Sequence, residues 1–163
     1  MNRDVFAVAE ELIKLCIDRK LTIATAESCT GGLVAGALTE IAGSSAVVDR
    51  GFVTYSNEAK QQMLGVSKST LDRFGAVSRE TAEEMARGAL AQSLAHIAVS
   101  ITGIAGPGGG SADKPVGLVH FAAASKRGAL SHVEMRYGDI GRGAVREKSV
   151  LQALAMLKEM AET

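Results

Sequence analysis

The sequence predicts an α/β fold: a three-layer α/β/α sandwich around a mixed five-stranded sheet. Helix-type and strand-type segments alternate through the first two-thirds of the chain, which is typical of parallel strands joined by helices. Residues 97–102 form a continuous apolar run, the mark of a strand that is buried on both faces. A loop without a helical pattern separates that run from the next strand. We therefore expect a sheet that is mostly parallel with one antiparallel strand.

The individual elements follow from hydrophobic spacing and from residues that start or stop helices. Apolar residues at helical spacing predict the first helix, and alternation or apolar runs predict the strands. Asn57 and Ser78 are good N-caps, Gly43 ends a helix, and Gly51 is a candidate bulge. We expect helices at residues 5–17, 30–41, 57–64, 78–95 and 142–160, a short turn capped by Ser67 or Ser69 and ending near residues 74–75, and strands at residues 21–26, 46–56, 97–102, 118–124 and 130–137.

The composition indicates one folded domain over residues 1–163. Apolar residues make up 47% of the chain, which is enough to bury a core and too many for a disordered protein. The 18 basic and 18 acidic side chains cancel, and no basic tract stands out, which argues against a nucleic-acid partner. No apolar run is long enough to span a bilayer, so we expect no membrane partner.

The cysteines and histidines bear on the compartment and on metal binding. Cys16 and Cys29 form no Cys-x-x-Cys motif, and the N-terminus shows no signal-peptide pattern, so reduced thiols in the cytoplasm are the simple interpretation. The three histidines, His96, His120 and His132, share no ligand spacing. We therefore expect neither a metal nor another cofactor.

Three loops are expected to meet at the carboxyl edge of the sheet, where open α/β sheets form their sites. They follow the first three strands and contain residues 27–32, 55–60 and 102–107. The first loop places Ser28 between a strand and a helix, and the second carries Tyr55 and Lys60. The convergence of the loops, rather than any single residue, indicates a functional site.

Ser28 and Lys60 suggest a hydrolase in which a lysine activates a serine. A serine is a weak nucleophile until a base removes its proton, and none of the three loops contains a histidine. Burial and a place in the first turn of a helix both lower the pKa of a lysine, so Lys60 is the candidate base. Tyr55 is a candidate to pass a proton or to hold the lysine amine. The ordinary alternatives are an N-cap serine, a solvated lysine and an aromatic residue at the core edge.

Backbone amides after Ser28 are candidates for stabilising an oxyanion, because the first N–H groups of a helix are unpaired. The candidate donors are the amides of Cys29, Thr30 and Gly31. Cys29 is also a rival nucleophile beside a helix N-terminus, although a small buried thiol is the more common role.

A glycine-rich loop over residues 103–117 has two interpretations. Its glycines allow close backbone approach to a ligand, as in a phosphate-binding nest, but a flexible hairpin loop has the same composition. The loop fits neither the P-loop nor the dinucleotide fingerprint, because no helix follows it. Arg142, near the start of the last helix, is a candidate phosphate clamp or an ordinary surface arginine.

Four separated motifs resemble the CinA C-terminal domain family over nearly the whole chain. They read AESCTGG at residues 26–32, GFVTYSNEAK at 51–60, GAVS at 75–78 and GIAGPGGGS at 103–111, and the match continues through KPVG at 114–117. The resemblance implies a sandwich with one antiparallel strand. It also implies a metal-independent amidohydrolase of pyridine-nucleotide salvage, which converts nicotinamide mononucleotide and water to nicotinate mononucleotide and ammonia.

The roles known for the family carry over onto matching positions of this chain. The resemblance implies Ser28 as the nucleophile, Lys60 as its base and Tyr55 as the assisting residue, and it adds substrate contacts from Thr102 and Arg142. The candidate set for oxyanion or substrate binding therefore comprises Cys29, Thr30, Gly31, Gly32, Thr102, Gly103, Gly106 and Arg142.

Two further functions stay open alongside the amidohydrolase. One is a non-catalytic nucleotide-binding module, and the other is an interaction partner related to competence or DNA damage. Many family members carry a large N-terminal domain linked to ADP-ribose hydrolysis, and this chain resembles the stand-alone form. We expect nicotinamide mononucleotide as its small-molecule partner and a homodimer as its assembly, the most common symmetric oligomer.

Overall fold

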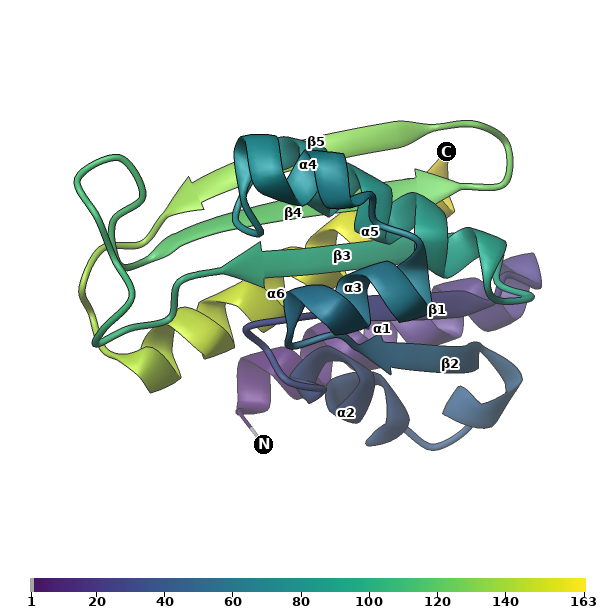
Figure 1. Cartoon of the computed structure of the whole chain (residues 1–163). Helices are drawn as coiled ribbons and strands as arrows, with labels where there is room; N and C mark the ends of the chain where they lie inside the picture. The colour runs from purple at the N-terminus through teal and green to yellow at the C-terminus, as the bar shows by residue number, and fades with distance from the viewer. Residues whose placement is uncertain (1) are drawn as a thin grey trace.

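A computed structural model of the chain describes residues 2–163 and shows a five-stranded sheet between two layers of helices (Figure 1). In chain order the elements are α1 (Arg3–Arg19), β1 (Ile23–Glu27), α2 (Leu33–Thr39), the 3₁₀ turn η1 (Ser44–Ala46), β2 (Val48–Val53), α3 (Asn57–Leu64), α4 (Lys68–Phe74), α5 (Arg79–Ala91), β3 (Ile97–Gly103), β4 (Leu118–Ser125), β5 (Leu130–Arg136) and α6 (Arg142–Glu162). Within this part of the chain, no helix combines the length and apolar character needed to cross a membrane.

The strands lie in the order β2-β1-β3-β4-β5, and β4 alone runs against the other four. The parallel strands β2, β1 and β3 are neighbours, so their carboxyl ends share one edge. The return from β3 to β4 is antiparallel, as the helix-free loop between them predicts. The predicted fold, mostly parallel with one antiparallel strand, is therefore confirmed.

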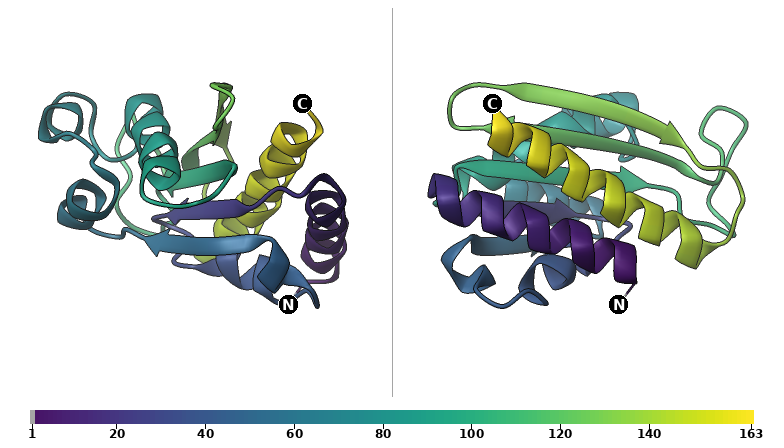
Figure 2. Two further views of the ribbon diagram at one scale, coloured as in Figure 1. Left: turned by 90° about the vertical axis from the view of Figure 1, so that its right-hand side faces the viewer. Right: turned by 180° about the vertical axis from the view of Figure 1, so that it is seen from behind.

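The two faces of the sheet are covered differently, as the view along the sheet shows (Figure 2). The helices α1, α2 and α6 cover one face, and α5 covers the other, with α3 and α4 packed outside it. Successive residues of β4 point to opposite faces. Val119 and Phe121 face α6 in the larger core, while Ala122 and Ala124 face α5. The small alanine side chains allow α5 to lie close to the sheet.

Several predicted boundaries were wrong by a few residues, and local hydrogen bonds explain why. The helix α3 is capped by Ser56, whose Oγ accepts from the Ala59 amide at 3.0 Å, so Asn57 is the first helical residue rather than the cap. The second helix begins at Leu33 rather than residue 30, because the preceding residues form a turn. The strand β2 covers only Val48–Val53, because η1 occupies residues at which the strand was expected to begin.

The predicted bulge at Gly51 was also wrong. Gly51 pairs with Thr25 in regular register, and the irregularity falls between Ile23 and Ala24, whose partners are Val48 and Arg50. Packing explains the glycine, because a Cβ at Gly51 would lie 2.7 Å from the Thr25 hydroxyl oxygen.

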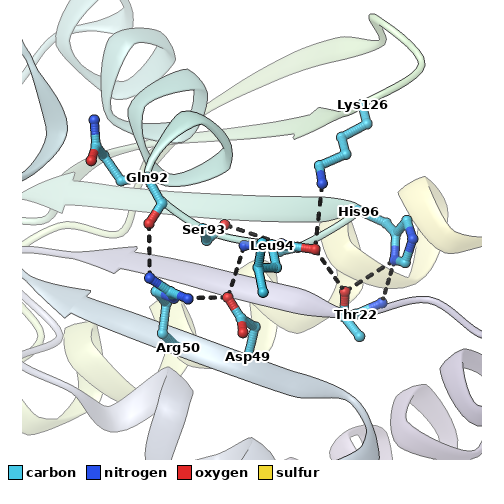
Figure 3. A network of polar contacts seen from close by, with 9 residues as sticks. Thr22, Asp49, Arg50, Gln92, Ser93, Leu94, His96 and Lys126 are labelled. Carbon is cyan, nitrogen blue, oxygen red and sulfur yellow. Dashed lines mark hydrogen bonds and ion pairs between the residues drawn. The ribbon is translucent and has the colours of Figure 1, made fainter.

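A polar network holds the strands together at the edge opposite their carboxyl ends (Figure 3). The Asp49 carboxylate accepts from the Leu94 amide at 3.0 Å and from the Arg50 Nε at 2.8 Å. The Thr22 amide donates to the His96 Nδ1 at 2.9 Å. These bonds tie the α5–β3 connection to the starts of β1 and β2, which keeps the three parallel strands aligned.

Candidate active site

The loops that leave β1, β2 and β3 converge on one cleft, as predicted from strand direction. The cleft has a volume of about 280 Å³. Its lining combines residues from all three loops with two residues of the segment before α5 and the first residue of α6: Ser28, Cys29, Tyr55, Asn57, Lys60, Ala76, Val77, Thr102, Gly103, Ile104, Ala105, Gly106, Gly108, Gly109 and Arg142. None of these residues is acidic, so the cleft favours an anionic ligand.

Ser28 and Lys60 meet at the floor of this cleft. The Lys60 Nζ lies 3.0 Å from the Ser28 Oγ, and the two residues are only 1% and 8% exposed, respectively. The Nζ also lies 2.9 Å from the Thr54 carbonyl oxygen and 3.3 Å from that of Tyr55. Within residues 2–163, no carboxylate lies at ion-pair distance from this amine.

Burial shifts Lys60 toward its neutral form. Burial lowers the pKa of Lys60 from its usual value of 10.5, against a smaller opposing effect of the Cys29 thiol. A neutral amine has two N–H bonds and one lone pair. The two carbonyl oxygens of Thr54 and Tyr55 can accept both N–H bonds. The lone pair is then left for the Ser28 hydroxyl, which is the arrangement a general base requires.

The turn after Ser28 is held by Glu27, a residue to which the sequence analysis gave no role. Its carboxylate is fully buried and accepts from the Thr30 hydroxyl at 2.6 Å and from the amides of Gly32, Val34 and Ala35 at 3.2, 2.9 and 3.0 Å. The N-terminal amides of α2 therefore point at Glu27. They do not point at a ligand beside Ser28, as the sequence analysis assumed.

These hydrogen bonds leave fewer of the predicted amides after Ser28 available as oxyanion donors. The Gly31 amide donates to the Ser28 carbonyl at 3.0 Å and the Gly32 amide to Glu27, so neither is available to a ligand. The amides of Cys29 and Thr30 donate to no backbone carbonyl in the described part of the chain. Of these two residues, Cys29 lines the cleft and Thr30 is buried beside it.

Cys29 itself is poorly suited to be the nucleophile. Its side chain is buried, and this burial raises the pKa of the thiol to about 11. At neutral pH the sulfur is therefore protonated, whereas the thiolate is the reactive form. The structure thus favours the ordinary interpretation of Cys29 as a small buried thiol.

Tyr55 and Arg142 lie together at the mouth of the cleft. Tyr55 is 62% exposed, and its phenolic oxygen accepts from the Arg142 Nη2 at 3.0 Å. Tyr55 contacts the Lys60 amine through its backbone carbonyl, so its hydroxyl does not hold that amine. The Arg142 Nη1 donates to the Gly106 carbonyl at 2.9 Å. Among the described residues, no carboxylate pairs with Arg142, which leaves its charge for an anion.

Thr102 and the glycine-rich loop form the opposite wall of the cleft. The Thr102 hydroxyl donates to the Ala76 carbonyl at 2.8 Å, which fixes the segment before α5. Gly103 and Gly106 are required by packing, because an added Cβ would lie 2.7 Å from a Val119 methyl and 2.5 Å from a Val116 methyl, respectively. The loop is thus packed against its own β4 end. This packing agrees both with a phosphate-binding nest and with a hairpin loop, the two interpretations of residues 103–117 given by the sequence.

Arg146, one turn after Arg142 in α6, is a second residue that the sequence analysis missed. Its Nε donates to the Cys29 carbonyl at 3.1 Å and its Nη2 to the Thr30 carbonyl at 3.4 Å. Nothing in the local helix pattern marks this arginine, because the residues it contacts are more than a hundred positions away. Within residues 2–163, no group of three or more histidine, cysteine or acidic side chains is placed to hold a metal ion.

Comparisons with known proteins agree with the motifs. The CinA C-terminal domain model matches residues 5–161. The nicotinamide-nucleotide amidohydrolase PncC of Escherichia coli K12 is 52% identical over 157 residues, which cover 96% of this chain and 94% of that protein. A putative competence-damage inducible protein of Caldicellulosiruptor bescii is 50% identical over 92% of this chain, which spans only 36% of that longer relative.

A solved structure extends the likeness to three dimensions. The competence/damage inducible protein CihA from Agrobacterium tumefaciens has a TM-score of 0.98 and 59% sequence identity, covering 100% of this chain and 98% of that one. Motifs, family model and fold thus agree over almost the whole chain, and the chain belongs to the CinA C-terminal domain family.

Proposed function

We propose that this protein is an amidohydrolase that deamidates nicotinamide mononucleotide to nicotinate mononucleotide and ammonia, with Ser28 as nucleophile and Lys60 as its base. The observation that carries the proposal is the buried 3.0 Å contact between the Lys60 amine and the Ser28 hydroxyl, with neutral carbonyls as the other neighbours of the amine. The substrate is suggested by relatives such as the E. coli amidohydrolase.

The first half of the proposed reaction forms an acyl-enzyme. Neutral Lys60 takes the hydroxyl proton of Ser28 as the Oγ bonds to the carboxamide carbon, and the carbonyl oxygen becomes an oxyanion. The Lys60 ammonium then gives this proton to the amide nitrogen. The carbon–nitrogen bond breaks, ammonia leaves, and the nicotinoyl group remains as an ester on Ser28.

The second half returns the enzyme to its starting state. Water enters the place of ammonia, and Lys60 removes its proton as the oxygen bonds to the ester carbon. Lys60 then protonates the Ser28 Oγ, and nicotinate mononucleotide is released. In both halves we assign stabilisation of the oxyanion to the amides of Cys29 and Thr30, which donate to no backbone carbonyl of residues 2–163.

The remaining cleft residues suit a nucleotide substrate. Arg142 presents a guanidinium without a carboxylate partner, and a guanidinium binds phosphate through parallel hydrogen bonds. Gly106, Gly108 and Gly109 line the same wall and allow close approach of a ligand. We therefore place the phosphate at the Arg142 end of the cleft and the carboxamide at Ser28. We assign Tyr55 to holding Lys60 and Arg142 rather than to proton relay.

This reaction belongs to pyridine-nucleotide salvage, because it turns one pyridine mononucleotide into another. A cytoplasmic homodimer built from a single domain stays a prediction. Light scattering on the purified protein measures its mass in solution and therefore tests the predicted homodimer.

The deciding experiment is ammonia release from nicotinamide mononucleotide, with a chelator present. We compare the wild type with Ser28→Ala and Lys60→Met, and we use Ser45→Ala and Lys148→Met at exposed positions as controls. We expect release by the wild type and both controls, and loss of nearly all turnover in the two site variants, with circular dichroism unchanged.

Other outcomes separate the rival functions. Substantial activity in Ser28→Ala would contradict the covalent mechanism. Nucleotide-induced thermal stabilisation without any ammonia release would instead favour a non-catalytic binding module. A protein or DNA complex that survives Ser28→Ala, again without ammonia release, would favour an interaction partner.

A further inference from the structure

Arg146 is held in a place that no ion pair explains. Its side chain is half-buried, and its guanidinium donates to two consecutive carbonyls, those of Cys29 and Thr30, at 3.1 and 3.4 Å. No carboxylate of residues 2–163 forms a salt bridge with it. Its positive charge is therefore directed at the backbone of the turn that follows Ser28.

The geometry of the peptide bond links this contact to the free amides. In a trans peptide the carbonyl and the N–H of the same plane point in opposite directions. The Cys29 carbonyl and the Thr30 amide share one plane, and Arg146 binds that carbonyl from the α6 side. The Thr30 N–H therefore points away from α6. The helix α3, which carries Lys60, lies on the face of the sheet opposite α6 (Figure 2).

The turn is thus fixed from two sides. Glu27 holds the Thr30 hydroxyl and the amides that follow it, while Arg146 holds the two carbonyls. Between these two anchors, the amides of Cys29 and Thr30 donate to no backbone carbonyl of residues 2–163. Thr30 is fully buried, and a buried amide that makes no backbone hydrogen bond is rare in proteins and calls for an explanation.

We propose that Arg146 is a positioning residue that orients and polarises the Cys29–Thr30 peptide, so that its amide stabilises the oxyanion formed by attack of Ser28. The inference rests on the proposed function and deepens it. A guanidinium suits this task because its planar fork can bind two carbonyls at once, whereas an ammonium is a point charge.

The charge of Arg146 also reaches the cleft. The Arg146 charge acts to lower the pKa of the Cys29 thiol, although burial outweighs it. The same positive potential favours an oxyanion beside Cys29. Gly31 leaves space for the Arg146 guanidinium beside the turn, because an added Cβ at position 31 would lie 3.2 Å from the Arg146 Nη2.

The test compares Arg146→Gln and Arg146→Lys with Lys148→Gln, which removes one positive charge from an exposed position of the same helix. Two rates are measured for each: turnover of nicotinamide mononucleotide, and covalent labelling of Ser28 by an alkyl fluorophosphonate. The label replaces fluoride on phosphorus with the Ser28 Oγ, releases hydrogen fluoride, and develops negative charge on the phosphoryl oxygen. It therefore needs the oxyanion donors without needing the nucleotide.

We expect Arg146→Gln to lower both kcat and the labelling rate by roughly 10- to 100-fold, with KM changed less than about twofold. Arg146→Lys is expected to fall between Arg146→Gln and the wild type. The midpoint of the pH–rate profile stays unchanged, because Lys60 is not disturbed. A merely structural role would not separate kcat from KM in this way.

Two results would overturn the inference: rates in Arg146→Gln within twofold of those in Lys148→Gln, or no labelling of wild-type Ser28. A shifted pH midpoint in Arg146→Gln would also do so, because the effect would then pass through Lys60. Wild type that is labelled at Ser28 but releases no ammonia would refute the proposed substrate. In that case the labelling rates alone would still decide the role of Arg146.

Discussion

Gly88, within α5, is a position at which helix propensity and packing predict opposite outcomes. Replacing a glycine by alanine within a helix is favoured by about 1 kcal/mol on propensity alone. In the folded protein an added Cβ would lie 1.9 Å from the carbonyl oxygen of Leu64, the last residue of α3. Cβ atoms essentially never come closer than 3.0 Å to a neighbour, so the two helices must separate by the difference, about 1.1 Å.

This separation reaches the proposed catalytic pair, because α3 carries Lys60. The Nζ–Oγ distance of 3.0 Å has no room for such a shift within hydrogen-bond range. A misplacement of about 1 Å costs on the order of 100-fold in rate, and overpacking costs about 1–3 kcal/mol. We therefore expect Gly88→Ala to lower kcat about 100-fold and the free energy of unfolding by about 2 kcal/mol.

Urea denaturation and the ammonia assay measure the two effects. Gly36→Ala is the matched control, because Gly36 also lies within a helix but an added Cβ there meets nothing within 4 Å. We expect the control to be as stable as the wild type or more stable, by at most about 1 kcal/mol, and to stay active. A Gly88→Ala variant as stable and as active as Gly36→Ala would refute the packing argument.

Two further predictions concern buried charges. Burial lowers the pKa of Lys60, so we expect kcat/KM to rise with pH and to level off at a midpoint below 10.5, as a pH–rate profile would show. The unfolded chain binds more protons than the folded one between the folded and unfolded pKa values of Lys60, so this residue makes stability rise with pH over that interval. A flat profile would argue against Lys60 as the base. We expect Glu27→Gln to lower the free energy of unfolding by about 2 kcal/mol, because an NH₂ group would face backbone donors, and thermal unfolding should show a drop of roughly 4–8 °C. An unchanged melting temperature would contradict the role of Glu27 in holding the turn.

The sequence was sufficient for the fold and for the meeting of Ser28 with Lys60. Both followed from periodicity and from the rule that the carboxyl ends of parallel strands share an edge. The burial of Lys60 could not be predicted in the same way, because it depends on α5 packing over α3. The same limit applied to the helix cap, where Ser56 and Asn57 were both suitable and only the path of the chain selects Ser56.

The roles of Glu27 and Arg146 depend on contacts that no local pattern records. A glutamate at the end of a strand gives no sign that its carboxylate turns to cap the next helix. An arginine in the last helix gives no sign that its side chain binds the turn that follows Ser28. Which amides stay unpaired depends on both residues, so the predicted donors Gly31 and Gly32 could not be separated from Cys29 and Thr30 in advance.

The burial of Lys60 has a consequence for the direction in which the reaction proceeds. The same buried surroundings that lower the pKa of the Lys60 amine make its ammonium form a stronger acid than a lysine in water, since the contacts of the amine are neutral groups. In water, a lysine that captured the serine proton would keep it. In the mechanism proposed above, the lowered pKa of Lys60 favours return of this proton to the departing nitrogen of the substrate. In that proposed mechanism Lys60 serves both bond formation and bond cleavage, so the cycle needs no second titratable side chain.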